Sequence, residues 1–186
     1  MTTEDMDEAR KLYSLAGESI QKQDFNAALA YFSKAIDHLP EDEKEARARI
    51  FNNMGHASVR LRKFNQALQL FKEAADLFME LGDEMSLGEQ FRNIGSVHRD
   101  MNEWDLALSN YFDSLEIFEK TDRKAGIAAQ YSNISYAFSG KGSLHEALEY
   151  SIKAKELFNE LGEPRGAKLS QQNIDALKAA LEGRDI

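Results

Sequence analysis

The feature that most constrains this chain is a repeat with a period of about 40 residues. Asparagine recurs at Asn53, Asn93, Asn133 and Asn173, each 40 residues after the one before. A second column with nearly the same period holds alanines, each followed by leucine: Ala28, Ala67, Ala107 and Ala147. Such a period is typical of proteins in which copies of one small unit stack and bury their hydrophobic faces against each other. The sequence therefore predicts a repeat protein.

Each repeat is expected to contain two α-helices. In the second repeat, hydrophobic and small residues recur every three or four positions from about Lys44 to Leu61, and again from about Phe64 to Leu81. This spacing places them on one side of a helix. The chain has only two prolines in 186 residues and is rich in Ala, Leu, Glu and Lys, which favour helix. The sequence thus predicts helix pairs joined by short turns.

Small and large residues occupy fixed places in each pair. The small residues of the first helices are Ala16, Gly55, Gly95 and Ser135. The aromatic residues of the second helices are Phe25, Phe64 and Trp104, and Phe32, Phe71 and Tyr111. Small side chains let two helices approach closely, and large rings fill the seam between repeats. This packing explains why a glycine that costs a helix about 1 kcal/mol is kept at position 55.

The pattern resembles the tetratricopeptide repeat, whose signature includes the small residue of the first helix, the Ala–Leu pair of the second, and an aromatic residue three positions before that alanine. The 40-residue period, with Asn-x-Gly in the first helix and Leu-Gly-Asp after the second, is most similar to the long-repeat variant of this family. That variant occurs in Leu-Gly-Asn-repeat polarity adaptors, kinesin light chains, and bacterial regulators of the Rap and MalT types. Across the family, these repeats serve as scaffolds for many different partners.

The resemblance implies an all-α fold, an α-α superhelix (solenoid) of four helix pairs plus a C-terminal capping helix. It implies a single domain over residues 1–186, with repeats at about 8–41, 42–83, 84–123 and 124–163 and the capping helix at 164–182. In the last helix, Gln171 and Asp175 stand where other repeats carry an aromatic and a small residue. A polar outer face of this kind is what a terminal repeat needs.

Composition argues against several classes of partner and location. The net charge of −9 argues against bulk binding to nucleic acid or to an anionic membrane. The acidic start of the chain is unlike a signal peptide, and no stretch approaches the roughly 18 apolar residues that span a membrane. The absence of cysteine excludes disulfides, thiolate zinc sites and cysteine nucleophiles, and suits a reducing compartment. We therefore expect a cytoplasmic protein with no membrane or nucleic-acid partner.

A row of polar residues follows the first helices on the side opposite the packed residues. In this family the first helices line the concave inner face, so the resemblance places this row there. The predicted partner-binding residues are Arg49, Asn52, Asn53, His56 and Arg60 in the second repeat, Arg92, Asn93 and Arg99 in the third, and Asn133 and Tyr136 in the fourth. The first helix adds Arg10, Tyr13 and Ser14, and the last adds Gln172 and Asn173. Arginine can hold a carboxylate through two parallel hydrogen bonds, and an asparagine amide can bond a peptide backbone.

The charges of the two helix layers differ. The second-helix segments are net negative in every repeat, whereas the first-helix segments of the second and fourth repeats are net positive. A locally basic inner face is therefore expected on an acidic protein. Two structural readings stay open beside this one: the asparagine column can simply bond neighbouring helices, and the arginine rows can be ordinary solvated faces.

Motifs that resemble chemistry have simpler explanations. His98-Arg99-Asp100 matches the start of a kinase catalytic loop, but no glycine-rich loop or DFG motif accompanies it. Residues 140–143, Gly-Lys-Gly-Ser, lack the spacing of a phosphate-binding loop and are expected to form the turn of the fourth repeat. The four histidines lie in different repeats, without the i, i+4 spacing of a zinc helix. We expect no catalytic residue, no cofactor and no metal.

The sequence favours a non-enzymatic adaptor that binds an acidic protein or peptide segment on the concave face. One alternative is a self-associating structural module, which would make the protein a homo-oligomer. Another is a regulatory repeat protein that contacts a signalling partner of the phosphotransfer type.

Overall fold

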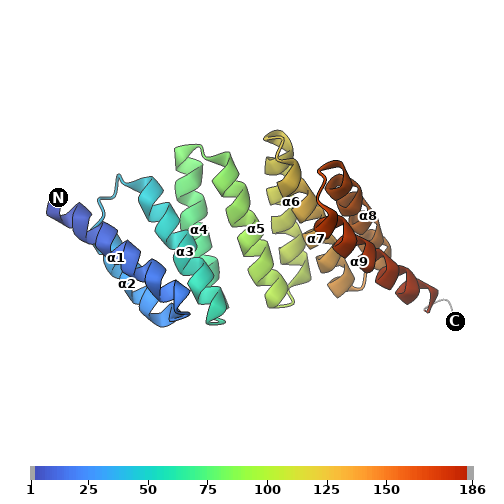
Figure 1. Ribbon diagram of the computed structural model, residues 1–186, viewed down its shortest axis with the longest axis horizontal. Helices are drawn as coiled ribbons and strands as arrows, with labels where there is room; N and C mark the ends of the chain where they lie inside the picture. Colours follow the sequence, from blue (N-terminus) through green and yellow to red (C-terminus); the bar gives the residue numbers. More distant parts are fainter. Residues whose placement is uncertain (1–2, 184–186) are drawn as a thin grey trace. The chain divides into compact units, whose positions relative to one another are not determined.

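The computed structural model describes residues 3–183, and over these residues the chain is helical apart from short turns (Figure 1). The helices of this described part are α1 (Thr3–Gln21), α2 (Phe25–Asp37), α3 (Lys44–Arg60), α4 (Phe64–Leu81), α5 (Glu84–Asp100), α6 (Trp104–Lys120), α7 (Lys124–Lys141), α8 (Leu144–Glu160) and α9 (Pro164–Glu182). The predicted all-α fold of helix pairs with one last helix is confirmed.

The chain divides into two compact units, unit 1 over Met1–Gln90 and unit 2 over Phe91–Ile186. The division falls within α5, so residues 84–90 belong to unit 1 and residues 91–100 to unit 2. In unit 1, α1 packs on α2, α2 on α3 and α3 on α4. In unit 2, α6 packs on α7, α7 on α8, and the last helix α9 on α8. We call α1, α3, α5, α7 and α9 the A helices and the others the B helices.

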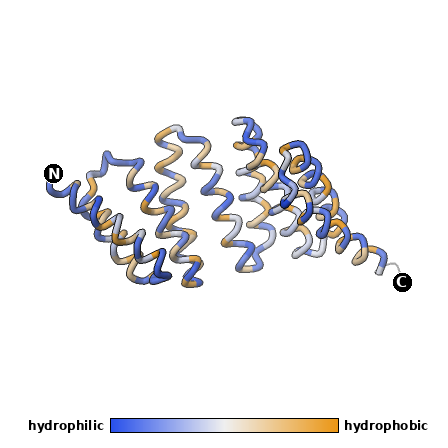
Figure 2. The backbone as a smooth tube through the Cα atoms, in the orientation of Figure 1, coloured by the Kyte–Doolittle hydropathy of each residue, from blue (hydrophilic) through white to orange (hydrophobic). Residues whose placement is uncertain are grey.

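Unit 1 is held together by the small and large residues that the repeat aligns. Along each helix, hydrophobic stretches alternate with hydrophilic ones, as expected for helices with one buried side (Figure 2). Phe32 of α2 and Phe71 of α4 are each 1% exposed. A Cβ atom added to Gly55 would lie 2.5 Å from the Phe71 ring, so only glycine allows α3 to approach α4 this closely. The predicted packing role of Gly55 is thereby confirmed.

Unit 2 uses the same places with more polar chemistry. Tyr111 of α6 is fully buried, and a Cβ atom added to Gly95 would lie 2.7 Å from its ring. In the fourth repeat, Ser135 takes the small position and donates a 2.8 Å hydrogen bond to the backbone oxygen of Ala147. Its oxygen also lies 2.6 Å from the hydroxyl of Ser151, which replaces the aromatic ring. Buried hydroxyls satisfied in this way hold α7 against α8 where no ring is available.

The tight turns share one backbone conformation. Gly82, Gly142 and Gly162 follow B helix α4, A helix α7 and B helix α8 with positive φ, where a glycine has no Cβ to clash. The corresponding residue of the other tight turns also has positive φ although it carries a side chain: Gln23, Arg62, Asn102 and Asp122. These left-handed residues recur at spacings of 39 or 40 residues within each class of turn.

The fold also corrects one prediction. Helix α7 continues through Lys141, so only Gly142 and Ser143 of the Gly-Lys-Gly-Ser stretch form the turn. Gly140 is the helical residue at which α7 crosses the indole ring of Trp104, and a Cβ atom there would lie 2.6 Å from the ring. In α9, the amide of Gln171 donates a 2.7 Å hydrogen bond to Asp175, and both side chains are polar, as expected of a terminal helix. Among the described helices, none has the length and hydrophobicity required to cross a membrane.

Candidate partner-binding surfaces

The predicted residues of the second repeat all lie on α3 in unit 1. Arg49, His56 and Arg60 are exposed, whereas Asn52 and Asn53 are partly buried. Their neighbours differ: Asn53 contacts Tyr13 of α1 and Arg60 contacts Phe25 of α2, whereas the His56 ring contacts Phe71 of α4. Unit 1 therefore brings the predicted row together on one helix.

A pocket of about 420 Å³ opens between α1 and α3. Its apolar lining consists of Met6, Ala9, Leu39, Ala46 and Ile50, and its polar lining of Arg10, Tyr13, Glu43 and Arg49. Arg10 and Arg49 come from the facing sides of the two A helices. The pocket thus combines an apolar floor with two guanidinium groups, one of them from the predicted row.

Within the described residues, each of the two arginines is paired with an acidic side chain of its own helix. Arg10 lies 3.2 Å from Asp7, and Arg49 lies 2.6 Å from Glu45, with all four side chains well exposed. Exposed pairs of this kind contribute only about 0.3–0.5 kcal/mol. An incoming carboxylate can therefore replace the helix's own acid at little cost.

Asn53 links two repeats. Its amide nitrogen donates a 2.9 Å hydrogen bond to the Tyr13 hydroxyl of α1, a residue 40 positions earlier. The Tyr13 ring meets Phe32 edge to face at a centroid distance of 5.5 Å. In this repeat the asparagine bonds a neighbouring helix, which supports the structural reading of the column while leaving Arg49 available.

Further along α3, a second pocket of about 310 Å³ is lined by Ile20, Phe25, His56, Ala57, Val59 and Arg60. The guanidinium carbon of Arg60 lies 5.1 Å from the centre of the Phe25 ring. The His56 ring meets Phe71 edge to face at 5.1 Å. Both predicted residues thus form the rim of this pocket by lying against aromatic rings.

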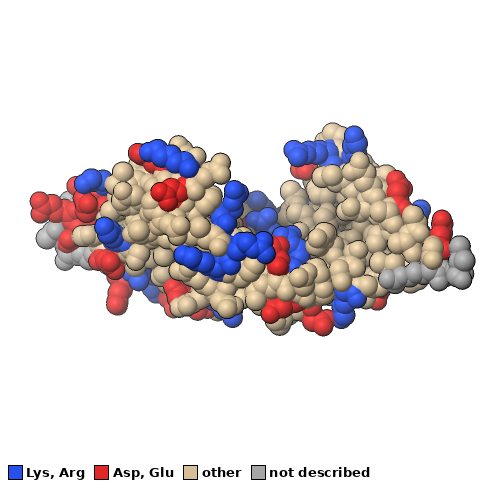
Figure 3. Space-filling model, turned by 90° about the horizontal axis from the view of Figure 1, so that it is seen from below, with Lys and Arg blue, Asp and Glu red and all other residues tan. Residues whose placement is uncertain are grey.

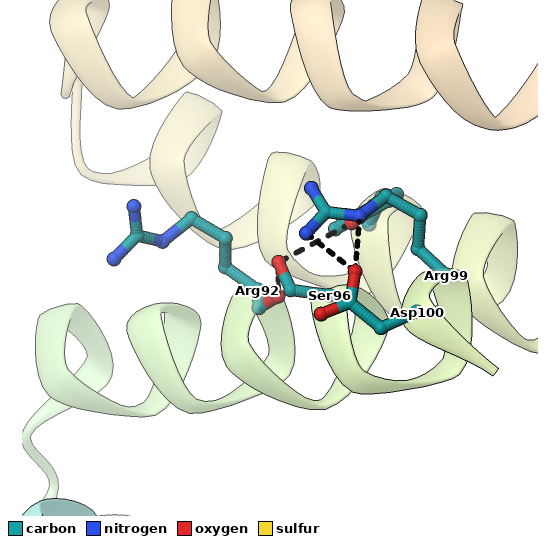
Figure 4. A network of polar contacts seen from close by, with 5 residues as sticks. Arg92, Ser96, Arg99 and Asp100 are labelled. Carbon is teal, nitrogen blue, oxygen red and sulfur yellow. Dashed lines mark hydrogen bonds and ion pairs between the residues drawn. The ribbon is translucent and has the colours of Figure 1, made fainter. Parts of the chain in front are cut away.

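In unit 2, the predicted residues of α5 form a polar network with α6 (Figure 4). The hydroxyl of Ser96 donates a 3.0 Å hydrogen bond to the backbone oxygen of Arg92. It accepts a 3.3 Å hydrogen bond from the Tyr111 hydroxyl. Burial raises the pKa of Tyr111 above its ordinary value. The ring is therefore a neutral hydrogen-bond donor under ordinary conditions.

Arg99 is held more firmly than the arginines of unit 1. Its Nε and Nη2 atoms donate to the same carboxylate oxygen of Asp100, at 3.0 and 2.8 Å. Its guanidinium carbon lies 5.7 Å from the centre of the Tyr136 ring of α7. Burial by itself lowers the pKa of Arg99, but the hydrogen bond to Asp100 and nearby charges outweigh burial and raise it. The charge is therefore fixed in place beside an aromatic ring.

The asparagine column behaves differently at each repeat of unit 2. Asn93 is buried, with 8% of its surface exposed. Asn133 donates a 3.3 Å hydrogen bond to Gln130, whose amide donates in turn to the buried Ser114 hydroxyl at 2.9 Å. Asn173 of α9 is exposed. Neither the burial of Asn93 nor the bonding of Asn133 was evident from their spacing, because the spacing gives the side of the helix and not the neighbour it meets.

A third pocket, of about 250 Å³, lies between α7 and α9. It is lined by Ser135, Tyr136, Ser139, Leu144, Asn173, Ala176, Leu177 and Ala180. Tyr136 is 59% exposed, which is unusual for an aromatic ring of this size. The sequence prediction included Tyr136 but missed Ala176 and Ala180, since small apolar residues carry no signal of binding by themselves.

The surface of unit 1 is not uniformly basic. Acidic side chains gather at its N-terminal end (Figure 3), where the first turns of α1 carry Glu4, Asp5, Asp7 and Glu8. The positive charge of this unit's A-helix side is thus concentrated on α3. Within the described residues, no group of three or more metal-ligating side chains is found.

Comparisons with known proteins agree with this architecture. The family model of the soluble NSF attachment protein, SNAP, matches residues 43–173, which is more than half of the chain. A comparison with curated protein sequences gives no significant match.

Several solved structures share the fold. The chain is similar to the apo form of RapI, with 16% identity and a TM-score of 0.81, covering 96% of this chain and 70% of that one. It is similar to a Rap protein complexed with Competence and Sporulation Factor, with 18% identity and a TM-score of 0.73, covering 96% of this chain and 50% of that one. A kinesin-light-chain-type protein of Podosopora anserina with TPR-like repeats gives 15% identity and a TM-score of 0.77, covering 95% of this chain and 87% of that one.

At these identities the similarity to solved structures establishes the fold alone, and it confirms the predicted tetratricopeptide-like repeat. The family match adds the narrower grouping: this chain belongs to the family of the soluble NSF attachment protein, SNAP.

Proposed function

We propose that this chain is a non-catalytic adaptor that binds an extended, acidic segment of another protein along its A-helix side. The observation that carries the proposal is the pocket between α1 and α3, where Arg10 and Arg49 border an apolar floor. An acidic residue of the partner would meet the guanidinium groups, and a neighbouring apolar side chain would enter the pocket. With a net charge of −9, nucleic acid and anionic membranes are poor partners for the chain as a whole.

The electrostatics of unit 1 support an acidic partner. Arg49 and Arg60 are both exposed and lie on the same helix, 11 residues apart. Three helical turns separate them by about 16 Å, a span that about five extended residues cover. Charges so arranged increase the rate of association and make binding sensitive to salt.

The comparisons support the class of function. The family is named for attachment to another protein, NSF. One structure with the same fold is of a Rap protein complexed with Competence and Sporulation Factor. Both point to protein or peptide partners for this fold, and we extend that class to this chain.

Affinity capture from a native extract tests the proposal. The double variant Arg10→Glu/Arg49→Glu reverses the charge at the pocket, and Lys34→Glu/Lys72→Glu makes the same charge change on exposed positions of α2 and α4. We expect the first variant to lose the captured proteins and the second to keep them. Raising the salt concentration should weaken capture by the wild type in the same way as the first variant.

Two controls complete this experiment. Circular dichroism must show the same helix content for both variants. Light scattering over a range of concentrations checks for self-association, because a mass that rises with concentration would favour the structural alternative. Equal capture by wild type and by Arg10→Glu/Arg49→Glu would rule out the proposed surface.

A further inference from the structure

Two of the pockets occupy the same place in the repeat. The pocket at the C-terminal end of α3 in unit 1 and the pocket between α7 and α9 in unit 2 are each lined by an A helix, the start of its B helix and the next A helix. The alignment pairs Ile20 with Ser139, Phe25 with Leu144, His56 with Ala176, Ala57 with Leu177 and Arg60 with Ala180. The two pockets can therefore be compared residue by residue.

The two sites differ in what covers the floor. In unit 1, Arg60 lies over the Phe25 ring, with a charged head at the rim. In unit 2, Leu144 replaces the ring and Ala180 replaces the arginine, so the charge and most of the covering side chain are gone. Leu144 and Leu177, which are 8% and 7% exposed, form an apolar floor.

The space in unit 2 is not a requirement of the repeat. One repeat earlier in the same unit, the equivalent pair is Trp104 and Gly140, and the indole ring lies so close that a Cβ atom on residue 140 would be 2.6 Å from it. The same position of the repeat is thus occupied by a ring between α6 and α7, whereas between α7 and α9 it is an open pocket of about 250 Å³. That volume is below the roughly 300–1,000 Å³ of small-molecule sites, and it suits a single side chain.

An aromatic residue connects this pocket to a fixed charge. Tyr136 lines the pocket and is 59% exposed. The guanidinium carbon of Arg99 lies 5.7 Å from the centre of its ring. Two nitrogens of Arg99 donate to Asp100, which leaves its third nitrogen, Nη1, as an additional donor in the planar group. An acidic residue and an apolar residue of one bound segment would thus find their partners on either side of Tyr136.

We propose that the α7–α9 pocket binds an aliphatic side chain, of the size of leucine, from a partner protein segment whose nearby acidic residue contacts Arg99. The inference rests on the proposed function and adds a sequence preference to it. Extended residues advance about 3.3 Å each. Since Arg99 lies 5.7 Å from the centre of the Tyr136 ring, which lines the pocket, we place the acidic residue one to three positions from the aliphatic one.

Selection of random twelve-residue peptides displayed on phage tests this preference, with the full chain as the immobilised target. Ala180→Arg reproduces the covering arginine of unit 1 and closes the pocket. Ala179→Arg adds the same charge to the same helix at an exposed residue that does not line the pocket. Circular dichroism confirms that each variant keeps the wild-type helix content.

Peptides selected on the wild type should carry an acidic residue within three positions of Leu, Ile, Val or Met. On Ala180→Arg the aliphatic enrichment should fall about tenfold, as expected for a lost leucine site, while the acidic enrichment remains. Ala179→Arg should select the same peptides as the wild type.

The other results count against the inference. Each target is also tested in combination with Arg10→Glu/Arg49→Glu, because the α1–α3 pocket has an apolar floor of its own. Acidic peptides without an aliphatic preference would overturn the inference and leave the proposed function standing. An aliphatic preference that persists when Ala180→Arg is combined with Arg10→Glu/Arg49→Glu would do the same. Peptide pools without acidic enrichment would overturn the proposed function as well.

Discussion

Units 1 and 2 build the same contact from different chemistry. In unit 1, Gly55 of α3 lies against the Phe71 ring, and His56 meets the edge of that ring. In unit 2, Gly95 of α5 lies against Tyr111, whose hydroxyl continues into a hydrogen-bonded chain with Ser96. The backbone approach is common to both, whereas the polarity around the ring differs. The repeat therefore fixes where a residue lies and leaves its chemistry open to change.

The two surfaces differ in the same way. Arg49 and Arg60 of α3 are exposed, and Arg49 is paired with Glu45, an acid of its own helix. The Arg99 side chain in unit 2 is 30% exposed, donates two hydrogen bonds to Asp100, and has the Tyr136 ring beside its guanidinium group. Unit 1 thus offers exposed arginines in surface pairs, and unit 2 offers one partly buried arginine near an apolar pocket.

The largest expected effect comes from removing a shared ring. Phe71→Ala should lower the free energy of unfolding by about 3–5 kcal/mol, because it leaves a cavity beside Gly55. Urea unfolding followed by circular dichroism measures the loss. Met79→Ala, on the same helix but 58% exposed, is the matched control and should change little.

The same experiment separates the two units. The single tryptophan, Trp104, lies in unit 2. Because stability in repeat proteins is largely a sum of local terms, the unfolding midpoint of Phe71→Ala should shift less by Trp104 fluorescence than by circular dichroism. Identical shifts by both probes would mean that the units unfold as one.

Adding a side chain where α7 crosses Trp104 of α6 should cause the next largest loss of stability. Gly140→Leu places a side chain where even a Cβ atom would be 2.6 Å from Trp104, so we expect a loss of about 1–3 kcal/mol. Better helix propensity offsets at most about 1 kcal/mol of this. Ala180→Leu, the equivalent change at the open pocket, should cost nothing. Urea unfolding of the two variants measures the contrast, and equal losses would contradict it.

A smaller effect depends on pH. Because burial raises the pKa of Tyr111 in the folded state, the unfolded chain loses this proton first as the pH rises. The stabilising contribution is complete below the ordinary tyrosine pKa of about 10 and disappears as the pH passes the higher folded value. Tyr111→Phe should cost about 1 kcal/mol at neutral pH.

The alkaline range gives this prediction its control. Melting temperatures of wild type and Tyr111→Phe should converge as the pH is raised above about 10. Unit 1 offers the natural comparison, since Phe71 has no hydroxyl at the same place. A constant difference at every pH would show that Tyr111 does not titrate in this way.

The smallest expected effect concerns the fixed charge. Asp100→Asn removes the carboxylate that holds Arg99, so acidic peptides selected on the wild type should bind roughly threefold to tenfold more tightly, which corresponds to about 1 kcal/mol. Fluorescence anisotropy of a labelled selected peptide measures the change. Asp113→Asn, the same charge change on B helix α6, should leave the affinity unaffected.

Much of the fold follows from the sequence, because it depends on columns that recur. Gly55 and Gly95 were identified from spacing alone, and the predicted start and end of the second repeat's helices agree with α3 and α4 to within one residue. A column is repeated several times, and each copy repeats the same physical constraint. Periodicity therefore predicts both the helices and the places where they touch.

The surfaces are predicted less completely from the sequence, because each pocket depends on residues from two different positions of the repeat. Asn93 is buried and Asn53 bonds Tyr13, although both occupy the same column. The open pocket arises where Leu144 meets Ala180, and the filled site where Trp104 meets Gly140. Each residue is ordinary by itself, and only the combination of sizes across two helices makes a cavity.

The shared backbone of the turns has a consequence for how such a chain can change length. Arg62 and Gly142 have the same left-handed conformation at the same point, two repeats apart. Joining the chain at these equivalent points removes two helix pairs without creating a new kind of turn, and duplicating the segment between them adds two. The number of A helices, and with it the number of binding positions along them, can thus decrease or increase by two at a time.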